Sequence, residues 1–214
     1  MSTLLEKRLW RYPSTYITDY ALAHLLGGTI NSCQSRIKRA VQAGLLTHIK
    51  RGLYCLSERC GVNPPHPFEL AQFIDGPSYI SLESALSFHH LIPEAVYTTT
   101  CVTTQRNKIV RTRLGRFTYQ RLPTNYFFYC EVMLIEDGDY RYYVASPWKA
   151  LCDYVYCNKK TEVTFSFLFD SLRIEPEELP IVSPTTLTIL KNFYRNNRVD
   201  QFIQRIPKEY IRAD

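Results

Sequence analysis

The sequence predicts an α+β protein in two parts: an N-terminal helical unit closed by a β-hairpin, and a larger mixed α+β domain with a mostly antiparallel sheet. Three observations predict this. Residues 1–57 show helical periodicity broken by turn signals and end in two short apolar runs. Residues 58–68 hold three prolines in four positions, and such a stretch predicts an exposed, stiff linker. Residues 69–214 mix strand-like runs with helical segments.

Composition narrows the class of protein. The chain has 214 residues, of which 45% are hydrophobic, enough for one large or two small globular domains. No apolar run approaches the ~20 residues that a membrane helix needs, and the first residues lack the pattern of a signal peptide. Seven cysteines without CxxC spacing are typical of a reduced protein with buried thiols. We therefore expect a cytoplasmic location and no cofactor.

The positive charge is concentrated in the first part of the chain. Residues 1–60 contain 9 Lys and Arg but 3 Asp and Glu, whereas residues 61–214 contain 17 of each kind. The whole formal excess of +6 therefore belongs to the N-terminal part. Such an asymmetry is typical of a module that binds nucleic acid.

Two helices are expected before residue 29. The first covers the apolar residues from Leu4 onward and ends at Pro13, and Thr18 can cap the second. Gly27 and Gly28 then break the chain before a third helix. The region therefore reads as helix, helix, turn and helix.

The third helix has two distinct faces. Asn31 or Ser32 can cap it, and Gly44 ends it. Its buried stripe follows helical spacing through Cys33, Ile37, Ala40, Val41 and Gly44. The other face carries amides, hydroxyls and cations, and no carboxylate occurs between residues 29 and 57. The candidate DNA-binding residues of this helix are Asn31, Ser32, Gln34, Ser35, Arg36, Lys38, Arg39 and Gln42.

A basic hairpin follows this helix. The apolar runs Leu45–Ile49 and Leu53–Leu56 are joined by Lys50, Arg51 and Gly52. A polar, cationic helix followed by a basic hairpin is the layout of a winged helix-turn-helix. Amide and guanidinium groups read base edges in pairs of hydrogen bonds, while Lys50 and Arg51 would neutralise phosphates of double-stranded DNA. The alternative is an ordinary amphipathic helix with a solvated face.

The second part predicts helices and strands in alternation. Ser81 can cap a helix over Leu82–His89, and Pro147 suits the first turn of another. Further helical segments are expected at residues 69–74, 184–195 and 199–206. Strands are expected at residues 96–103, 109–114, 116–122 and 127–135, and from Tyr140 onward.

A second group of cations lies in residues 106–121. The segment contains no acid, and Phe117 and Tyr119 between its cations could stack on bases. Its cations are Arg106, Lys108, Arg111, Arg113, Arg116 and Arg121. They form either a second nucleic-acid surface or the solvated face of a hairpin, and the sequence leaves both interpretations open.

The sequence offers no pattern typical of catalysis or of a metal site. Cys55 with Cys60, and Cys152 with Cys157, lack the usual ligand spacing. His89 and His90 cannot join Glu83 and Glu94 in a three-ligand cluster on one helix. Ser81, Ser84, His89 and Asp153 could be drawn as a hydrolase triad, but no G-x-S-x-G context exists. We therefore expect neither an enzyme nor a metal.

Four segments, in this order and spacing, resemble the AbiEi-type antitoxin family of bacterial type IV toxin–antitoxin systems. They are AGLLTHIKRGLYCL (43–56), YISLESALSFHHLIP (79–93), RLGRFTYQRL (113–122) and VASPWKALCDYVY (144–156). The chain departs from the family pattern at His90, where glycine is usual, and at Trp148, where a small or acidic residue is common.

The resemblance implies two roles. The N-terminal winged helix would bind inverted repeats in its own promoter and repress the operon. The C-terminal domain would counter a nucleotidyltransferase-like toxin without binding it stably. Two alternatives stay open: an enzyme directed to nucleic acid, with its active site in the C-terminal domain, and a stand-alone regulator without a toxin partner.

Overall fold

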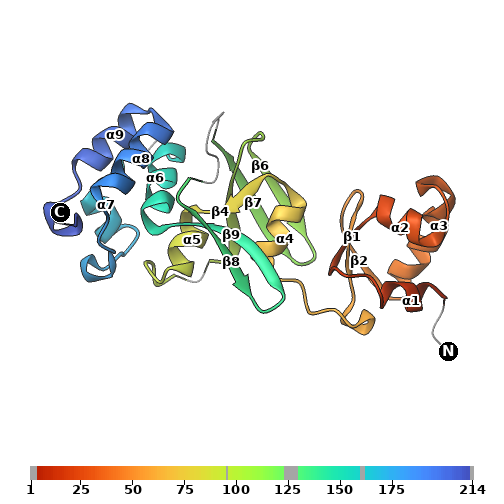
Figure 1. Ribbon diagram of the computed structural model, residues 1–214. Coiled ribbons are helices and arrows are strands. Elements are labelled where there is room, and N and C mark those ends of the chain that lie inside the picture. The colour runs from red at the N-terminus through yellow and green to blue at the C-terminus, as the bar shows by residue number, and fades with distance from the viewer. Residues whose placement is uncertain (1–3, 95, 123–129, 160–161, 213–214) are drawn as a thin grey trace. The chain divides into compact units, whose positions relative to one another are not determined.

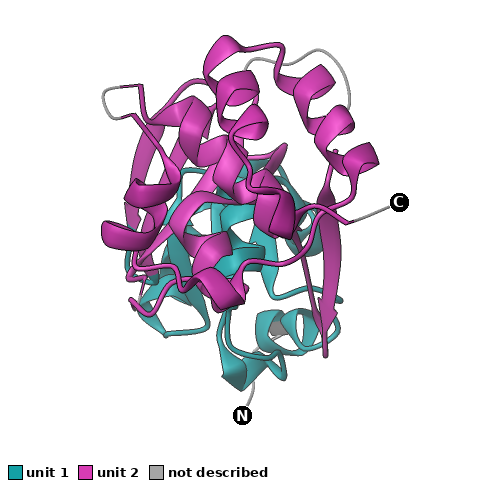
Figure 2. Ribbon diagram, turned by 90° about the vertical axis from the view of Figure 1, so that its left-hand side faces the viewer, with its two compact units in different colours: residues 1–74, 112–114 teal, residues 75–111, 115–214 magenta. Residues whose placement is uncertain are grey.

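The computed structural model describes residues 4–94, 96–122, 130–159 and 162–212, and it confirms a mixed α+β protein (Figure 1). The chain divides into two compact units (Figure 2). The first comprises residues 1–74 with 112–114, and the second comprises residues 75–111 with 115–214. No helix among the described residues is long and apolar enough to cross a membrane.

The first unit combines helices with a small three-stranded sheet. Its elements are α1 (Leu4–Leu9), β1 (Tyr16–Thr18), α2 (Asp19–Leu26), α3 (Ile30–Gln42), β2 (Leu46–Lys50), β3 (Leu53–Leu56), a 3-10 turn (Glu58–Cys60) and α4 (Pro67–Ile74). The three strands are antiparallel in the order β1-β3-β2. The expected order of helices and hairpin is therefore present, and β1 is an addition.

Apolar residues from every early element meet in the core of this unit. Leu9, Leu22, Ile37 and Leu56 are buried there at 4% exposure or less. Thr18 caps α2, as expected, and Gly27 ends it in the left-handed conformation that glycine tolerates.

The first compact unit continues past the expected boundary at residue 57. Cys60 is buried in its core, and the rings of Tyr16 and Phe73 lie 4.4 Å apart between centroids. The hydroxyl of Tyr16 also donates to the carbonyl oxygen of His66 at 3.4 Å. Residues 58–60 and α4 therefore pack with the first unit, because they bring apolar groups that its sheet can bury.

The second unit is built on a six-stranded sheet in the order β6-β7-β5-β4-β9-β8. The strands are β4 (Ser78–Ile80), β5 (Thr98–Thr103), β6 (Lys108–Thr112), β7 (Gly115–Arg121), β8 (Val132–Asp137) and β9 (Tyr140–Ala145). Part of the strand expected at residues 127–135 lies outside the described residues, and β8 covers its end.

This sheet is mixed, because it contains parallel pairs beside the expected antiparallel ones. Strands β4 and β5, and β8 and β9, are antiparallel, whereas β5 pairs with β7 and β4 pairs with β9 in parallel. Strand β6 follows β5 in the sequence, but in the sheet β7 lies between them. Strand β7 therefore pairs with β5 in parallel. A simple meander, which short connections suggest, would have given antiparallel neighbours.

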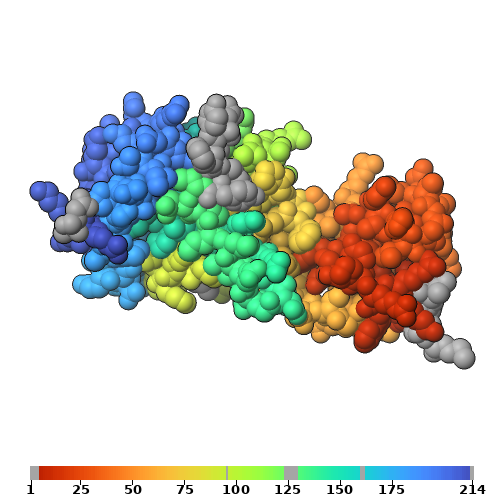
Figure 3. Space-filling view, in the orientation of Figure 1, coloured from red at the N-terminus to blue at the C-terminus, as the bar shows by residue number. Residues whose placement is uncertain are grey.

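Helices complete the second unit. They are α5 (Leu82–Phe88), α6 (Pro147–Cys157), α7 (Phe165–Asp170), α8 (Pro184–Tyr194) and α9 (Asn197–Gln204), with 3-10 turns at Pro176–Glu178 and Lys208–Tyr210. The expected helices in the tail agree with α8 and α9 to within a residue or two, whereas α7 was not expected. Helices α8 and α9, in blue, form much of the visible surface at the C-terminal side of this unit (Figure 3).

Candidate nucleic-acid interface

Helix α3 begins two or three residues earlier than expected. Its N-cap is Thr29, whose hydroxyl accepts from the backbone N–H of Ser32 at 3.2 Å. The hydroxyl of Ser32 accepts in return from the backbone N–H of Thr29 at 2.9 Å. This reciprocal capping box replaces the expected cap at Asn31 or Ser32. It also ties the Ser32 hydroxyl to the helix terminus.

The two faces of α3 are largely as expected. Cys33, Ile37 and Ala40 are buried, and Val41 is half-buried. Gly44 is exposed, with φ at +70°, so it ends the helix and does not extend the buried stripe. The polar residues of the opposite face that are exposed to solvent are Asn31, Ser32, Gln34, Ser35, Lys38, Arg39 and Gln42.

The side chain of Arg36 is used inside the first unit. Its Nη1 donates to the carbonyl oxygen of Leu26 at 3.1 Å, and its Nη2 lies 3.2 Å from the Sγ of Cys33. The guanidinium thus satisfies a carbonyl at the C-terminal end of α2 and holds α2 against α3. Sequence reasoning placed Arg36 with the DNA-facing residues; its contacts are structural.

The two cations of the hairpin tip, Lys50 and Arg51, have different surroundings. Arg51 is exposed in the two-residue turn, and Gly52 has φ at +78°. Lys50 directs its ammonium to the carbonyl oxygen of Ile74 at 2.5 Å. The backbone N–H of Asp19 donates to the carbonyl oxygen of Gly52 at 3.1 Å, which ties the tip to the start of α2. The tip is therefore a braced hairpin with Arg51 on its surface.

The six cations of residues 106–121 have different surroundings. Lys108 makes an ion pair with Asp75 and lies 5.6 Å from the ring centroid of Tyr119. Lys108 and Arg116 line one pocket, whereas Arg106 and Arg121 line another. Arg111 and Arg113 are exposed and line neither pocket.

A buried polar cluster in the second unit was not anticipated from the sequence. The ammonium of Lys149 donates at 2.8 Å to Oδ1 of Asp153 and to the hydroxyls of Tyr79 and Tyr194. Asp153 also accepts from the hydroxyl of Ser81 at 2.7 Å. Lys149 and Asp153 are both 0% exposed. The i, i+4 spacing of a lysine and an aspartate among apolar residues of α6 was the signal in the sequence.

This cluster revises the expected cap of α5. Ser81 precedes the helix but makes no side-chain cap hydrogen bond, since its hydroxyl goes to Asp153. The ring of His89 contacts the carbonyl oxygen of Ala145 at 2.8 Å. The structure thus joins Ser81 to Asp153 but directs His89 to the end of β9.

The chemistry of the cysteines agrees with protonated thiols. Cys33, Cys55, Cys60, Cys101 and Cys152 are buried, and all seven cysteines are free. Burial raises the pKa of Cys55 to about 12. Among the described residues, no group of three His, Cys, Asp or Glu side chains could hold a metal ion.

The chain matches no known family model and no curated protein.

Proposed function

We propose that the chain is a sequence-specific DNA-binding transcriptional repressor whose first unit is a winged helix-turn-helix. The observation that carries this proposal is the exposed face of α3, which presents amides and cations and no carboxylate. Arg39 and Gln42 are the residues best suited to read bases, because guanidinium and amide groups form paired hydrogen bonds with guanine and adenine.

The order of elements in the first unit supports the same proposal. Helix α2, a glycine turn and α3 are followed by the β2–β3 hairpin, and β1 pairs with β3. Helix α3 has 13 residues and is therefore about 20 Å long, enough to lie along a major groove. Arg51 at the hairpin tip would then contact a phosphate.

Two of the candidate residues of α3 are engaged within the first unit. Arg36 is held by Leu26 and Cys33, and the Ser32 hydroxyl is held by Thr29. The proposed base-reading residues are Asn31, Gln34, Ser35, Lys38, Arg39 and Gln42. Because Lys50 is engaged with Ile74, the hairpin would act mainly through Arg51.

The proposed biological role is that of the antitoxin in a bacterial type IV toxin–antitoxin system. It rests on the four sequence segments that resemble the AbiEi-type family. In that role the protein would bind inverted repeats in its own promoter, and its second unit would counter a nucleotidyltransferase-like toxin without a stable complex. Co-expression with a nucleotidyltransferase-like neighbouring gene tests this role: restored growth supports it, and continued growth arrest contradicts it.

DNA binding is tested with the duplex that lies upstream of the coding sequence. Fluorescence anisotropy should give tighter binding to this duplex than to a shuffled duplex of the same length, by about 10³-fold or more at physiological salt. The shuffled duplex measures the phosphate term alone, because its charge is unchanged. Equal affinity for both duplexes would contradict sequence-specific recognition.

A further inference from the structure

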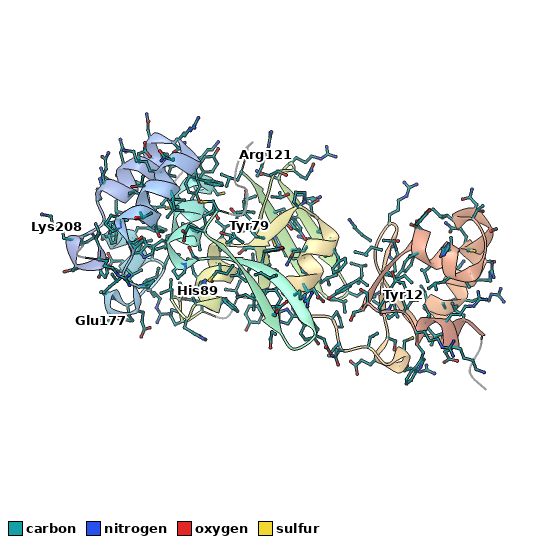
Figure 4. All side chains as sticks on the ribbon, in the orientation of Figure 1. Tyr12, Tyr79, His89, Arg121, Glu177 and Lys208 are labelled. Carbon is teal, nitrogen blue, oxygen red and sulfur yellow. The ribbon has the colours of Figure 1, made fainter. Side chains whose placement is uncertain are left out.

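One pocket of the second unit gathers cations from three segments. It has a volume of about 480 Å³ and is lined by Arg106 before β6, Arg121 at the end of β7 and Lys159 after α6. Asn107 and Gln120 add amides and Tyr156 a phenol, and no carboxylate lines the pocket among the described residues. Figure 4 labels Arg121, the last residue of β7.

Several basic residues of the second unit are paired with a carboxylate, whereas among the described residues the cations of this pocket are not. Lys108, Arg141, Arg173 and Arg205 all have a carboxylate partner within 3.2 Å. In the part of the chain that the structure describes, Arg106, Arg121 and Lys159 have no such partner. Three like charges thus lie around one cavity in a region, residues 61–214, whose net charge is zero. A concave site of one sign of charge attracts a ligand of the opposite sign.

The wall that carries two of these cations is held in place. The side-chain oxygen of Asn107 accepts from the backbone N–H of Arg121 at 2.6 Å. This bond fixes the loop that carries Arg106 against the end of β7. Two guanidinium groups carried on this wall suit a phosphate, since each can donate paired hydrogen bonds to its oxygens.

A larger pocket adjoins the cationic one. The two share Asn107, Gln120 and Cys157, and the larger has a volume of about 950 Å³. It offers aromatic rings from Tyr97 and Tyr154 together with amides and hydroxyls. Its lining also includes the carboxylates of Glu83 and Glu94 and the cations Lys108 and Arg116. Small-molecule sites are typically ~300–1,000 Å³ and combine apolar surface with a few polar groups. A nucleoside fits this description, and its phosphate would then lie in the smaller pocket, which has three cations and, among the described residues, no carboxylate.

We propose that these joined pockets bind a nucleotide, with its phosphate held by Arg106, Arg121 and Lys159 and its base and sugar in the larger pocket. The phosphate can belong to a free nucleotide or to the end of a nucleic-acid strand, since both present the same group. The site lies wholly in the second unit, and it does not depend on DNA binding by α3.

Calorimetry on the full chain tests this site. ATP should bind, and adenosine and sodium triphosphate should each bind at least about tenfold more weakly, because each lacks one half of the ligand. The variant Arg106→Gln/Arg121→Gln/Lys159→Gln should lose at least about tenfold in ATP affinity. The control Arg111→Gln/Lys191→Gln/Lys208→Gln removes the same charge from exposed positions outside both pockets and should bind ATP like the wild type.

Two further arms identify the source of the phosphate. Both ligands are measured on the Arg39→Ala/Gln42→Ala variant, a 5′-phosphorylated tetranucleotide and ATP. Tighter binding of the tetranucleotide identifies the ligand as the end of a nucleic-acid strand, and tighter binding of ATP identifies it as a free nucleotide. The proposal is overturned if ATP does not bind to a wild-type chain that melts cooperatively. It is overturned equally if triphosphate matches ATP, or if the control variant loses as much affinity as the pocket variant.

Discussion

The buried pair of Lys149 and Asp153 predicts a large and specific loss of stability. Replacement of Lys149 by Met keeps a similar length but removes three hydrogen bonds of 2.8 Å and the positive charge. Asp153 would then be a carboxylate with 0% exposure and no cation beside it. Removal of one partner from a buried ion pair typically costs about 3–5 kcal/mol. For a unit of this size, that loss lowers the melting temperature by roughly 10 °C.

The double variant separates the pair from its surroundings. Lys149→Met/Asp153→Leu removes both charges, so no unpaired ion stays buried, although the hydroxyls of Ser81, Tyr79 and Tyr194 lose partners. Its loss in the free energy of unfolding should be smaller than the sum of the two single losses by at least about 1 kcal/mol.

Trp148 provides the assay because it is buried beside Lys149 in α6, and the chain contains only two tryptophans. With Trp10 replaced by Phe, guanidinium unfolding followed by tryptophan fluorescence reports on the second unit. A loss below about 1 kcal/mol in Lys149→Met would refute the reasoning, as would additive losses in the double variant.

Three further predictions concern the cap, the hairpin and a histidine. Thr29→Ala should cost about 1 kcal/mol of stability through the lost capping box, whereas Asn31→Ala should cost little. Equal losses in thermal melts would contradict the assignment of Thr29 as the N-cap. Arg51→Ala should weaken binding to every DNA sequence and make the slope of log affinity against log salt concentration shallower by about one. Lys50→Ala should mainly lower the melting temperature, because it removes the contact with Ile74. The reverse result in anisotropy and melting experiments would contradict that contact. Burial lowers the pKa of His89 in the folded chain. His89 therefore binds a proton more readily in the unfolded chain, and stability is lost as the pH falls below about 6.5. His89→Gln should flatten this dependence in melts between pH 7.5 and 5. His90→Gln should change it much less, because His90 is an exposed neighbour whose charge lowers the pKa of His89 less than burial does. An unchanged profile in His89→Gln would argue against this reasoning.

Local signals in the sequence predicted local structure well. Thr18, Gly27 and Pro147 determine helix ends through bonds and angles within a few residues, and the structure has all three in the expected roles. Strands β1 and β4 have three residues each, too few for a periodic pattern to be recognised. The parallel pairing of β5 and β7 depends on where a later strand inserts, and no local pattern specifies that.

In the candidate site, too, local features could be predicted and long-range contacts could not. The exposed face of α3 follows from its helical spacing, and most of its expected residues are exposed. The roles of Arg36 and Lys50 could not be predicted, because their partners Leu26 and Ile74 lie 10 and 24 residues away. Ser81 carries the residue type of a helix cap, yet its hydroxyl binds Asp153, 72 residues later. Tertiary contacts of this kind decide which polar side chains are left for a ligand.

The most direct test of DNA recognition compares Arg39→Ala/Gln42→Ala with the control Arg11→Ala, an exposed cation on the loop after α1. Anisotropy with the upstream duplex and a shuffled duplex gives the ratio of the two affinities for each protein. The double variant should lose about tenfold to a hundredfold in affinity for the upstream duplex and much less for the shuffled one, because base contacts are lost. The control should keep the wild-type ratio. A double variant that keeps the wild-type ratio as well would show that this face of α3 does not read DNA.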